Sequence, residues 1–562
     1  MTKTPCDQSS SKSGPECHKF DMGRFVVSVQ DGQISEIFFG DIEVSRGVTY
    51  LVRDENWATL EAQTSLRYQG NLTDNKIEIS GEVNAGQCHF EYTISVEATT
   101  DSHLEVTTTG RALSSFNANR VGLSVLHPAS ICAGAELEVF NSNGNRTKTE
   151  FPLLISPSQP VFDIKKLSFN MSNVTNVEME FMSRRPDGTE QAFEMEDQRN
   201  WGDASYKTYV GSLQDPWPYQ VKSGEIFVQK LSITAERSTN SAAGSPAKAV
   251  SKGSENQQAK PLPSIGIAVP FGEAQLALEN LNHFGCYRPD FISAYLKSNA
   301  LDEAEIRAIC QISEILQCPV SIELEIHGNP AVALEAFTDV VANAELSIEH
   351  LLACPSVYLE SYQPDAKWPS YLPLSDFYEL VRKWFPQSKI GGGMLTYFTE
   401  LNRKWPPEAP IDFVGHAFCP IIHAADDTTI MQNTESLRYM AATVREKMPR
   451  VPHRIISASL SMRQNPYGAG PVIGKKGECV AMNANDPRES TLIGAIWMKT
   501  VLETLADTNV EAVVLGALSG PSSIYSARSN EGFHCFDFLR ELSEIASPTQ
   551  RDIVDISKKL FS

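Results

Sequence analysis

The sequence predicts a multidomain protein in which an N-terminal antiparallel β-sandwich is followed by a (β/α)8 TIM barrel. Three observations support this prediction. The chain of 562 residues is too long for a single core. Its first part alternates apolar and polar residues with a period of two, and its last part alternates short apolar runs with amphipathic helical segments. Residues 1–19 are largely polar, and we expect them to be disordered.

Residues 20–235 are expected to form the sandwich. Runs such as "KIEISGEV", "CHFEYTISVEA" and "HLEVTTTGRAL" alternate apolar with polar residues and break at turn residues. Many short strands with almost no helical period are typical of an antiparallel sandwich. Residues 236–263 contain Ser, Ala, Gly, Lys, Pro and Gln without periodic apolar positions, which predicts a linker or an inserted loop.

Residues 264–562 are expected to form the barrel and its C-terminal helices. The strand candidates are "SIGIAVP", "DFISAYL", "PVSIELEI", "SVYLES", "KIGGGML", "DFVGHAF", "RIISASLS" and "EAVVLGA", with helical segments between most of them. Strands that alternate with helices indicate parallel βαβ units, and eight units fit a closed barrel. The alternative is an open doubly wound sheet, but no Gly-rich phosphate loop follows any of these strands.

Composition limits the partners and the compartment. A net charge of −21 provides no basic stripe for phosphates, which argues against nucleic acid. No run of 18 apolar residues predicts a membrane span, and the start of the chain has no apolar signal segment. Eleven cysteines without paired spacing favour free thiols in a reducing cytoplasm. We therefore expect a small-molecule substrate, and the sequence leaves a homo-oligomer open.

The candidate site lies where the predicted barrel strands end, because the functional side chains of such barrels lie at the C-terminal ends of the strands. These ends are rich in carboxylates, histidines and arginines. The candidates are Glu325 and His327 after the third strand, Glu360 after the fourth, Tyr397, Glu400, Asn402 and Arg403 after the fifth, His423 and Asp426 after the sixth, and Arg463 after the seventh.

The segment "HAADD" has three interpretations. His423 beside Asp426 is the arrangement of a general base oriented by a carboxylate. Histidine with carboxylates can also bind a metal, but the i, i+4 histidine pair of zinc helix motifs is missing, so we expect neither a metal nor another cofactor. Alternatively, Asp426 caps the helix predicted to begin at "TTIMQNTESL".

The stretch "EMEDQRNWGDASYKTY", residues 194–209, differs from the strands around it. Six of its sixteen residues are charged, and it also contains Trp and Tyr, which is more than a short turn requires. We interpret it as a contribution of the β-domain to the barrel mouth, in which Glu196, Asp197 and Arg199 face the substrate. The alternative is packing at a domain interface.

Several blocks of the chain together resemble the D-apionate lactonase family. They are "EMEDQRNWGDASYKTY", "PWPY", "TYFTELNR", "IIHAADDTTIMQN" and "DPRESTLIGAIW". The resemblance implies an N-terminal β-domain, a (β/α)8 barrel, a C-terminal β-domain and hydrolysis of an aldonolactone to its acid in carbohydrate catabolism. This chain reads as helix after its eighth strand, so we expect the family's C-terminal β-domain to be missing.

The function expected is that of a lactonase, a hydrolase that opens a D-apionolactone-like sugar-acid lactone. Such a reaction needs a base for water, a stabilised oxyanion and protonation of the ring oxygen. The expected roles are base for Glu400 or His423, orientation of His423 for Asp426, oxyanion stabilisation for Arg403 or Arg463, and acid for Glu360.

Two other functions stay open. In a glycoside hydrolase, Glu360 and Glu400 would be the pair of carboxylates that flanks the scissile bond. In a non-catalytic carbohydrate-binding relative, the same barrel mouth would hold a sugar without turning it over.

Overall fold

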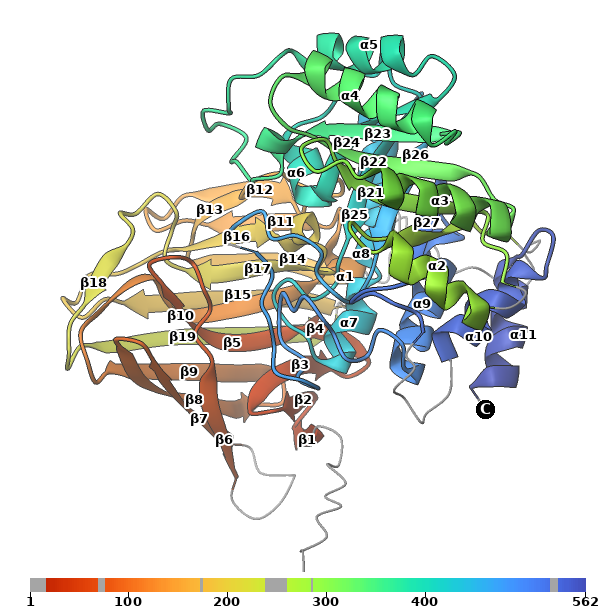
Figure 1. Ribbon diagram of the computed structural model, residues 1–562. Coiled ribbons are helices and arrows are strands. Elements are labelled where there is room, and N and C mark those ends of the chain that lie inside the picture. The colour runs from red at the N-terminus through yellow and green to blue at the C-terminus, as the bar shows by residue number, and fades with distance from the viewer. Residues whose placement is uncertain are drawn as a thin grey trace, which may run out of the picture. The chain divides into compact units, whose positions relative to one another are not determined.

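A computed structural model describes residues 17–68, 76–171, 175–237, 260–284, 287–468, 470–525 and 534–561. The chain forms two compact units (Figure 1). The first comprises Met1–Leu153, Gln159–Asp197 and Ser205–Val250, and the second comprises Leu154–Ser158, Gln198–Ala204 and Ser251–Ser562. Two short segments within the first domain's sequence therefore belong to the barrel unit.

The first domain contains a ten-stranded sheet with the order β1-β2-β3-β5-β10-β17-β16-β13, in which β4 pairs with β3 and β18 pairs with β10. All of its pairs are antiparallel. The strands are β1 (Cys17–Met22), β2 (Phe25–Gln30), β3 (Gln33–Phe39), β4 (Ile42–Ser45), β5 (Gly47–Asp54), β10 (Phe116–Pro128), β13 (Val161–Ile164), β16 (Phe193–Asp197), β17 (Ser205–Val210) and β18 (Tyr219–Val221).

A second, nine-stranded antiparallel sheet has the order β12-β11-β14-β15-β19-β9-β8-β7-β6. Aromatic rings from the two sheets contact each other: the ring centroids of Tyr50 and Phe90 are 5.9 Å apart, and those of Phe181 and Phe193 are 4.9 Å apart. The strands are β6 (Ala62–Tyr68), β7 (Lys76–Ala85), β8 (Cys88–Thr100), β9 (His103–Ala112), β11 (Glu136–Phe140), β12 (Arg146–Glu150), β14 (Lys166–Met171), β15 (Thr175–Arg184) and β19 (Ile226–Arg237), and a short helix α1 (Ala129–Cys132) follows β10. The predicted antiparallel sheets are confirmed.

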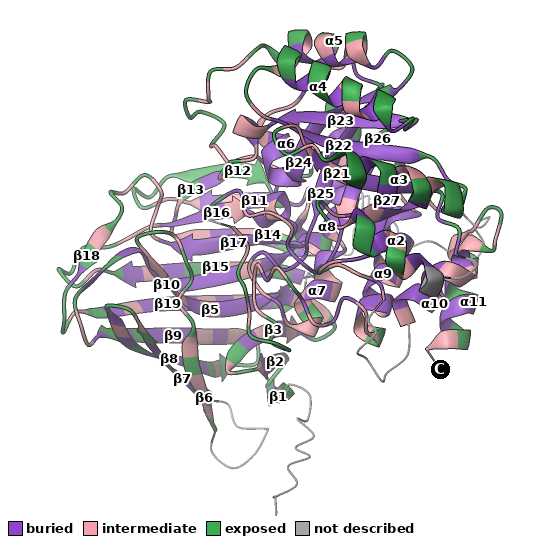
Figure 2. Ribbon diagram, in the orientation of Figure 1, coloured by how far each residue is buried: buried purple, intermediate pink, exposed green. Residues whose placement is uncertain are grey.

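The second unit contains a closed barrel of parallel strands, so the open doubly wound alternative is wrong. Figure 2 shows these strands as mostly buried, which agrees with their apolar runs. The strands are β20 (Ser264–Val269), β21 (Phe291–Lys297), β22 (Val320–Ile326), β23 (His350–Pro355), β24 (Lys389–Tyr397), β25 (Phe413–Phe418), β26 (His453–Ala458) and β27 (Val510–Ala517).

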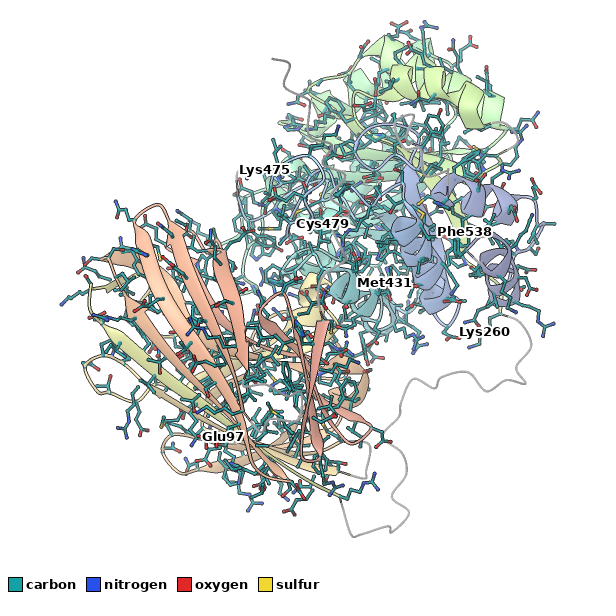
Figure 3. All side chains as sticks on the ribbon, turned by 90° about the horizontal axis from the view of Figure 1, so that it is seen from below. Glu97, Lys260, Met431, Lys475, Cys479 and Phe538 are labelled. Atoms are coloured by element: carbon teal, nitrogen blue, oxygen red, sulfur yellow. The ribbon has the colours of Figure 1, made fainter. Side chains whose placement is uncertain are left out.

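Helices connect the barrel strands, and side-chain caps start several of them. Asp302 accepts from Ala304 N at the start of α3, and Asn329 accepts from Ala331 N at the start of α4. None of the described helices is long and apolar enough to cross a membrane. The helices are α2 (Ala274–Phe284), α3 (Glu303–Leu316), α4 (Pro330–Asn343), α5 (Leu374–Trp384), α6 (Phe398–Arg403), α7 (Asp427–Asn433), α8 (Ser436–Lys447), α9 (Leu492–Leu505), α10 (His534–Ser543) and α11 (Gln550–Leu560); the 3-10 turns are η1 (Gln198–Trp201) and η2 (Ser356–Tyr358). Figure 3 marks Lys475 and Cys479 between β26 and α9, and Phe538 on α10.

The position of the fourth barrel strand differs from the prediction. The strand predicted at "SVYLES" is not a strand: β23 is "HLLACP", and Ser356–Tyr358 is the 3-10 turn η2. The run "HLLACP" is buried on both faces and therefore shows no alternation, which is why its pattern is weak as a strand signal. Glu360 consequently lies beyond η2 and not at the end of a strand.

The domain boundaries 20–235 and 264–562 stay predictions. Strand β1 begins at Cys17, β19 ends at Arg237 and β20 begins at Ser264. Most of the predicted disordered N-terminus and most of the predicted linker lie outside the described residues, which omit 1–16 and 238–259.

Candidate active site at the carboxyl ends of the barrel strands

A histidine and a carboxylate form the chemical centre of the candidate site. His423 follows β25, and its Nδ1 lies 2.6 Å from Oδ2 of Asp203, which belongs to the segment Gln198–Ala204. The side chain of His423 is 24% exposed and that of Asp203 is 9% exposed. Nε2 of His423 makes no hydrogen bond within the described part of the chain. This is the geometry of a general base whose second nitrogen a carboxylate holds in place.

The local backbone explains how Asp203 reaches the histidine. Gly202 has a φ of +97°, and a Cβ there would lie 3.2 Å from the carbonyl oxygen of Cys419, so only glycine fits without strain. Asn433 of α7 then fixes the segment: its Nδ2 donates to Oδ1 of Asp203 at 3.3 Å, and its Oδ1 accepts from Ala204 N at 3.1 Å.

Asp426 is a helix cap, which was the alternative prediction for this residue. Its Oδ1 accepts from Thr429 N at 2.8 Å and caps α7. The expectation that Asp426 orients His423 is corrected, because Asp203 occupies that position and the Asp426 carboxylate is engaged with the helix.

Trp201 lies between the histidine and an arginine. Its ring centroid is 6.2 Å from that of His423 and 4.8 Å from that of Tyr467, and Arg403 Cζ lies 4.9 Å from the indole centroid. Arg403 donates to the carbonyl of Pro157 and to Ser361 Oγ, which leaves the Nη2 donors without a partner among the described residues. A base and a cation with unused donors thus flank one indole ring.

Glu400 is fully engaged inside the protein. It is 0% exposed, and its two oxygens accept from Tyr397 N at 3.1 Å and from the Tyr467 hydroxyl at 2.8 Å. Burial raises the pKa of Glu400. Its neighbour Asn402 donates to the carbonyl of Ile155 at 3.1 Å and to the side chain of Asn200 at 2.9 Å. Both side chains therefore hold the loops that carry the site.

A second polar cluster occupies the ends of β21 and β22. Glu325 accepts from the Tyr295 hydroxyl at 2.6 Å and forms an ion pair with His327 at 2.6 Å. The side chain of Gln464 donates to the Tyr295 oxygen at 2.6 Å, and the backbone carbonyl of Gln464 accepts from the Tyr397 hydroxyl at 3.1 Å. Gln464 thus connects this cluster to β24, the strand that precedes Glu400.

Arg463 is charge-matched inside the barrel. It pairs with Glu323 at 2.7 Å and also donates to the carbonyl of Leu395. Glu323 accepts in addition from Ser293 Oγ at 3.0 Å. Arg463 is therefore less suited than Arg403 to stabilise a new negative charge.

Glu360 stands apart from these groups. It is exposed on the loop after η2 and accepts from the hydroxyl of Tyr362 at 2.8 Å. It makes no hydrogen bond or ion pair with Glu400 among the described residues. The two carboxylates of a glycoside hydrolase lie about 5–9.5 Å apart without direct contact, so the glycoside hydrolase alternative stays a prediction.

Of the three candidates in residues 194–209, Glu196 and Asp197 belong to the first unit and Arg199 belongs to the second. Arg199 is fully buried in the barrel unit, 4.6 Å from the ring of Tyr439. Glu196 forms an ion pair with Lys207 at 3.1 Å within the first domain, where Asp197 is 1% exposed. The residue of this stretch that meets His423 is Asp203.

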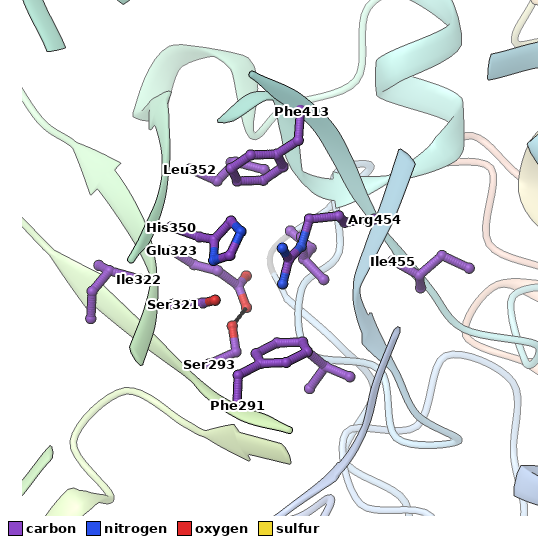
Figure 4. Close-up of a pocket in the computed structure, with 12 residues that line it drawn as sticks. Phe291, Ser293, Ser321, Ile322, Glu323, His350, Leu352, Phe413, Arg454 and Ile455 are labelled. Carbon is purple, nitrogen blue, oxygen red and sulfur yellow. Dashed lines mark hydrogen bonds between the residues drawn. The ribbon is translucent and has the colours of Figure 1, made fainter. Parts of the chain in front are cut away.

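A cavity lies at the opposite, amino-terminal ends of the strands (Figure 4). Arg454 lies 4.8 Å from the ring of Phe291 and 5.3 Å from that of Phe413. Burial lowers the pKa of His350 to about 3, so this histidine is a poor base. The remaining lining is apolar apart from Ser293, Ser321 and Glu323, and the Glu323 carboxylate is already engaged with Ser293 and Arg463. It is lined by Phe291, Ser293, Ser321, Ile322, Glu323, His350, Leu352, Phe413, Arg454, Ile455, Ile456 and Val514.

Sequence reasoning missed several members of the site. Asp203 and Trp201 stand within the quoted stretch, but a sequence pattern does not show which of its carboxylates meets a barrel loop. Tyr467 and Gln464 follow the seventh strand without a motif of their own. No group of three or more His, Cys, Asp or Glu among the described residues could hold a metal ion.

Comparisons with known proteins agree with this architecture. Residues 7–238 match the family model described as D-apionate lactonase, N-terminal domain, and residues 265–547 match the one described as D-apionate lactonase, TIM barrel domain. A D-apionate lactonase from Brucella anthropi is 32% identical over 514 residues, which cover 89% of this chain and 82% of that protein.

Solved structures show only distant similarity. A GalM/aldose epimerase homologue from C. elegans is 7% identical and covers 40% of this chain and 99% of its own, with a TM-score of 0.27. A GH30 endoxylanase from Clostridium papyrosolvens is 8% identical and covers 52% of this chain and 75% of its own, with a TM-score of 0.33. At these scores the similarities support no conclusion about this chain.

Proposed function

Because this chain belongs to the D-apionate lactonase family, we propose that it is a lactone hydrolase that opens a sugar-acid lactone, with D-apionolactone as the model substrate. The observation that carries the proposal is the hydrogen bond between Nδ1 of His423 and Oδ2 of Asp203 at 2.6 Å, which leaves Nε2 of the histidine open at the carboxyl ends of the strands. Family membership supports the reaction, and the dyad supports the position of the site.

In the proposed reaction, Nε2 of His423 takes a proton from a water molecule as the water oxygen attacks the lactone carbonyl carbon. The Asp203 carboxylate balances the imidazolium that forms. The donors on Nη2 of Arg403 stabilise the oxyanion of the tetrahedral intermediate. When the intermediate collapses, the bond between the carbonyl carbon and the ring oxygen breaks, and the Nε2 proton moves to that oxygen. Lactone and water thus become one hydroxy acid.

We propose that the second polar cluster binds the hydroxyl groups of the sugar. Glu325 and His327 provide acceptors and donors, and both lie at the end of β22. Tyr467 and Trp201 form an apolar wall on which the carbon–hydrogen face of a sugar ring can pack. This pairing of carboxylate and aromatic side chains suits a polyhydroxylated lactone better than an apolar ester.

We also propose a sandwich for the first domain and a cytoplasmic location. The aromatic contacts between the two sheets support the sandwich. The cysteines of the described chain are free, which supports a reducing compartment.

The test is proton release in a pH-stat with a panel of aldonolactones that includes D-apionolactone, run beside a panel of aryl glycosides. We expect turnover of one or more lactones and none of the glycosides. Hydrolysis of a glycoside without any lactone would establish the glycoside hydrolase alternative. Binding of sugars without turnover of either panel would contradict an enzyme. The His423→Gln variant is the control for contaminating activity.

A further inference from the structure

A buried arginine of the first domain has no acceptor. Arg120 on β10 is 4% exposed. Its Nε is buried without a hydrogen-bond partner, and its side chain forms no hydrogen bond or ion pair among the residues that the structure describes. Its Cζ lies 3.5 Å from the ring centroid of Tyr209 and 5.5 Å from that of Trp57. Stacking on two aromatic faces fixes the guanidinium plane, but it does not use the planar donors.

Two further cationic side chains of the first domain lie near Arg120. Arg53 of β5 is its direct cross-strand neighbour, a like-charge pairing that is unfavourable by itself. Lys207 on β17 is 3% exposed and pairs with Glu196 at 3.1 Å. Burial, together with repulsion from Arg53 and Arg120, lowers the pKa of Lys207 to about 8.

The nearby carboxylate of Glu194 forms its hydrogen bonds with other groups and none with Arg120. It accepts from the Tyr209 hydroxyl at 2.5 Å, from Ser212 Oγ at 2.6 Å and from Leu213 N at 3.0 Å. These bonds hold Glu194 and the Tyr209 ring in place. The ring in turn supports the guanidinium.

We propose that Arg120 is the main ligand-binding residue of a carboxylate site on the ten-stranded sheet, and that the site takes an open-chain sugar acid. A buried cation is stable only with a partner, and the guanidinium fork matches a carboxylate with two parallel hydrogen bonds. Trp57 lies beside it, Trp217 packs on Trp57 with ring centroids 5.2 Å apart, and Trp217 is 50% exposed, so an aromatic surface is available for a sugar chain. The choice of a sugar acid as the ligand rests on the proposed function, because lactone opening produces a sugar acid. The proposal that Arg120 binds an anion does not depend on the proposed function.

Isothermal titration calorimetry on the full chain tests this site with D-gluconate as the probe. D-glucitol, which lacks the carboxylate, and inorganic phosphate serve as the two comparison ligands. We expect gluconate to bind, glucitol not to bind, and Arg120→Met to weaken gluconate binding at least tenfold. The matched control is Arg24→Met, because Arg24 is an exposed arginine of the same domain that stacks on Phe39 at 4.5 Å.

The outcomes separate this proposal from the lactonase reaction. Arg120→Met is expected to keep the lactone turnover number. If the wild type, in which Arg120 is intact, does not turn over lactones, that result contradicts the proposed barrel reaction and not the carboxylate site at Arg120. Thermal unfolding with and without gluconate distinguishes loss of binding from loss of folding. The ligand should raise the Tm of the wild type and of Arg24→Met but not that of Arg120→Met. Arg120→Lys should bind gluconate with intermediate affinity. Unchanged gluconate binding by Arg120→Met, or no binding by the wild type, overturns the proposal. Phosphate binding as tight as gluconate binding overturns the choice of a sugar acid.

Discussion

The barrel contains histidines in two environments that differ in what they can do with a proton. His423 follows β25, is 24% exposed and meets a carboxylate at 2.6 Å. His416 and His453 lie inside the barrel wall, both 0% exposed, with their Nε2 atoms 2.9 Å apart. Burial lowers the pKa of His416 to about 4, so the pair stays neutral at physiological pH.

The arginines repeat this contrast. Arg454 at the amino-terminal ends is held between two phenyl rings and pairs with Glu511 at 3.4 Å. Arg403 at the carboxyl ends stacks on one indole and keeps unused donors. Residue type alone therefore does not identify the site. An oriented partner and access to water distinguish the residues of the site from the others.

The largest effect is expected from exchanging His423 for glutamine. The variant keeps the volume but loses the base, so kcat/KM for lactone hydrolysis should fall by about 10²- to 10⁴-fold. Steady-state kinetics in a pH-stat would measure it, and circular dichroism would confirm that the fold is kept.

The matched control is His416→Gln at the buried pair. It disturbs the hydrogen bond to His453 and should lower the free energy of unfolding by about 1–3 kcal/mol, with an unchanged turnover number for the folded fraction. If both variants lost activity equally while folded, the contrast between the two environments would be wrong.

Asp203→Asn should have the next largest effect. Asn433 Nδ2 already donates to one Asp203 oxygen, so an asparagine would turn its own oxygen there and present its amide nitrogen to His423. That arrangement favours the wrong imidazole tautomer, and kcat should fall by about 10- to 10³-fold.

Asp426→Ala is the comparison for that variant. It removes the cap of α7 and should cost about 1 kcal/mol of stability with kcat unchanged. A larger loss of kcat for Asp426→Ala than for Asp203→Asn would restore the role that the sequence suggested for Asp426.

The sequence was informative where local pattern determines structure. Period-two alternation predicted the antiparallel sheets, and alternating strands and helices predicted the closed barrel. It was less informative for β23, whose burial on both faces removes the alternation. His423 was found because it follows a strand. Asp203 was not, because its place depends on a turn at Gly202 and on an amide 230 residues away in sequence.

A pH-dependent stability is expected from Glu489, which is buried beside the loop after β26. Its oxygens accept from Ser461 N at 2.7 Å and Leu460 N at 3.3 Å, and burial raises its pKa to about 7. The folded state holds a proton that the unfolded state loses near pH 4.5. The contribution of Glu489 to stability should therefore be greatest below that pH, and it should fall by up to about 3 kcal/mol as pH rises to 7.

Differential scanning calorimetry of the wild type and Glu489→Gln between pH 4.5 and 8 measures this contribution. The variant carries no charge at any pH, so its Tm relative to the wild type should increase with pH. If the difference in Tm between the variant and the wild type were the same at every pH, Glu489 would not contribute to the pH dependence of stability.

The smallest effect is expected from Gly202→Ala. The added Cβ meets the Cys419 carbonyl in a backbone conformation that alanine avoids, at a cost of about 1–2 kcal/mol. A backbone shift at residue 202 that relieves this contact should move Asp203 and lower kcat several-fold. Gly328→Ala is a suitable control, since Gly328 also has a positive φ, of +68°, but nothing lies within 4 Å of its Cβ position. Equal effects of both substitutions on kcat would show that the close approach at Gly202 is unimportant for the site.

The most direct measurement is a double-mutant cycle of Asp203→Asn and His423→Gln on lactone hydrolysis. If Asp203 acts by orienting His423, its substitution should have almost no effect on kcat once His423 is glutamine, and the coupling should equal nearly the whole effect of Asp203→Asn in the wild type. If the fold-decrease in kcat of the double variant equalled the product of the fold-decreases of the two single variants, the two residues would act independently, and this would contradict the role of Asp203 in orienting His423.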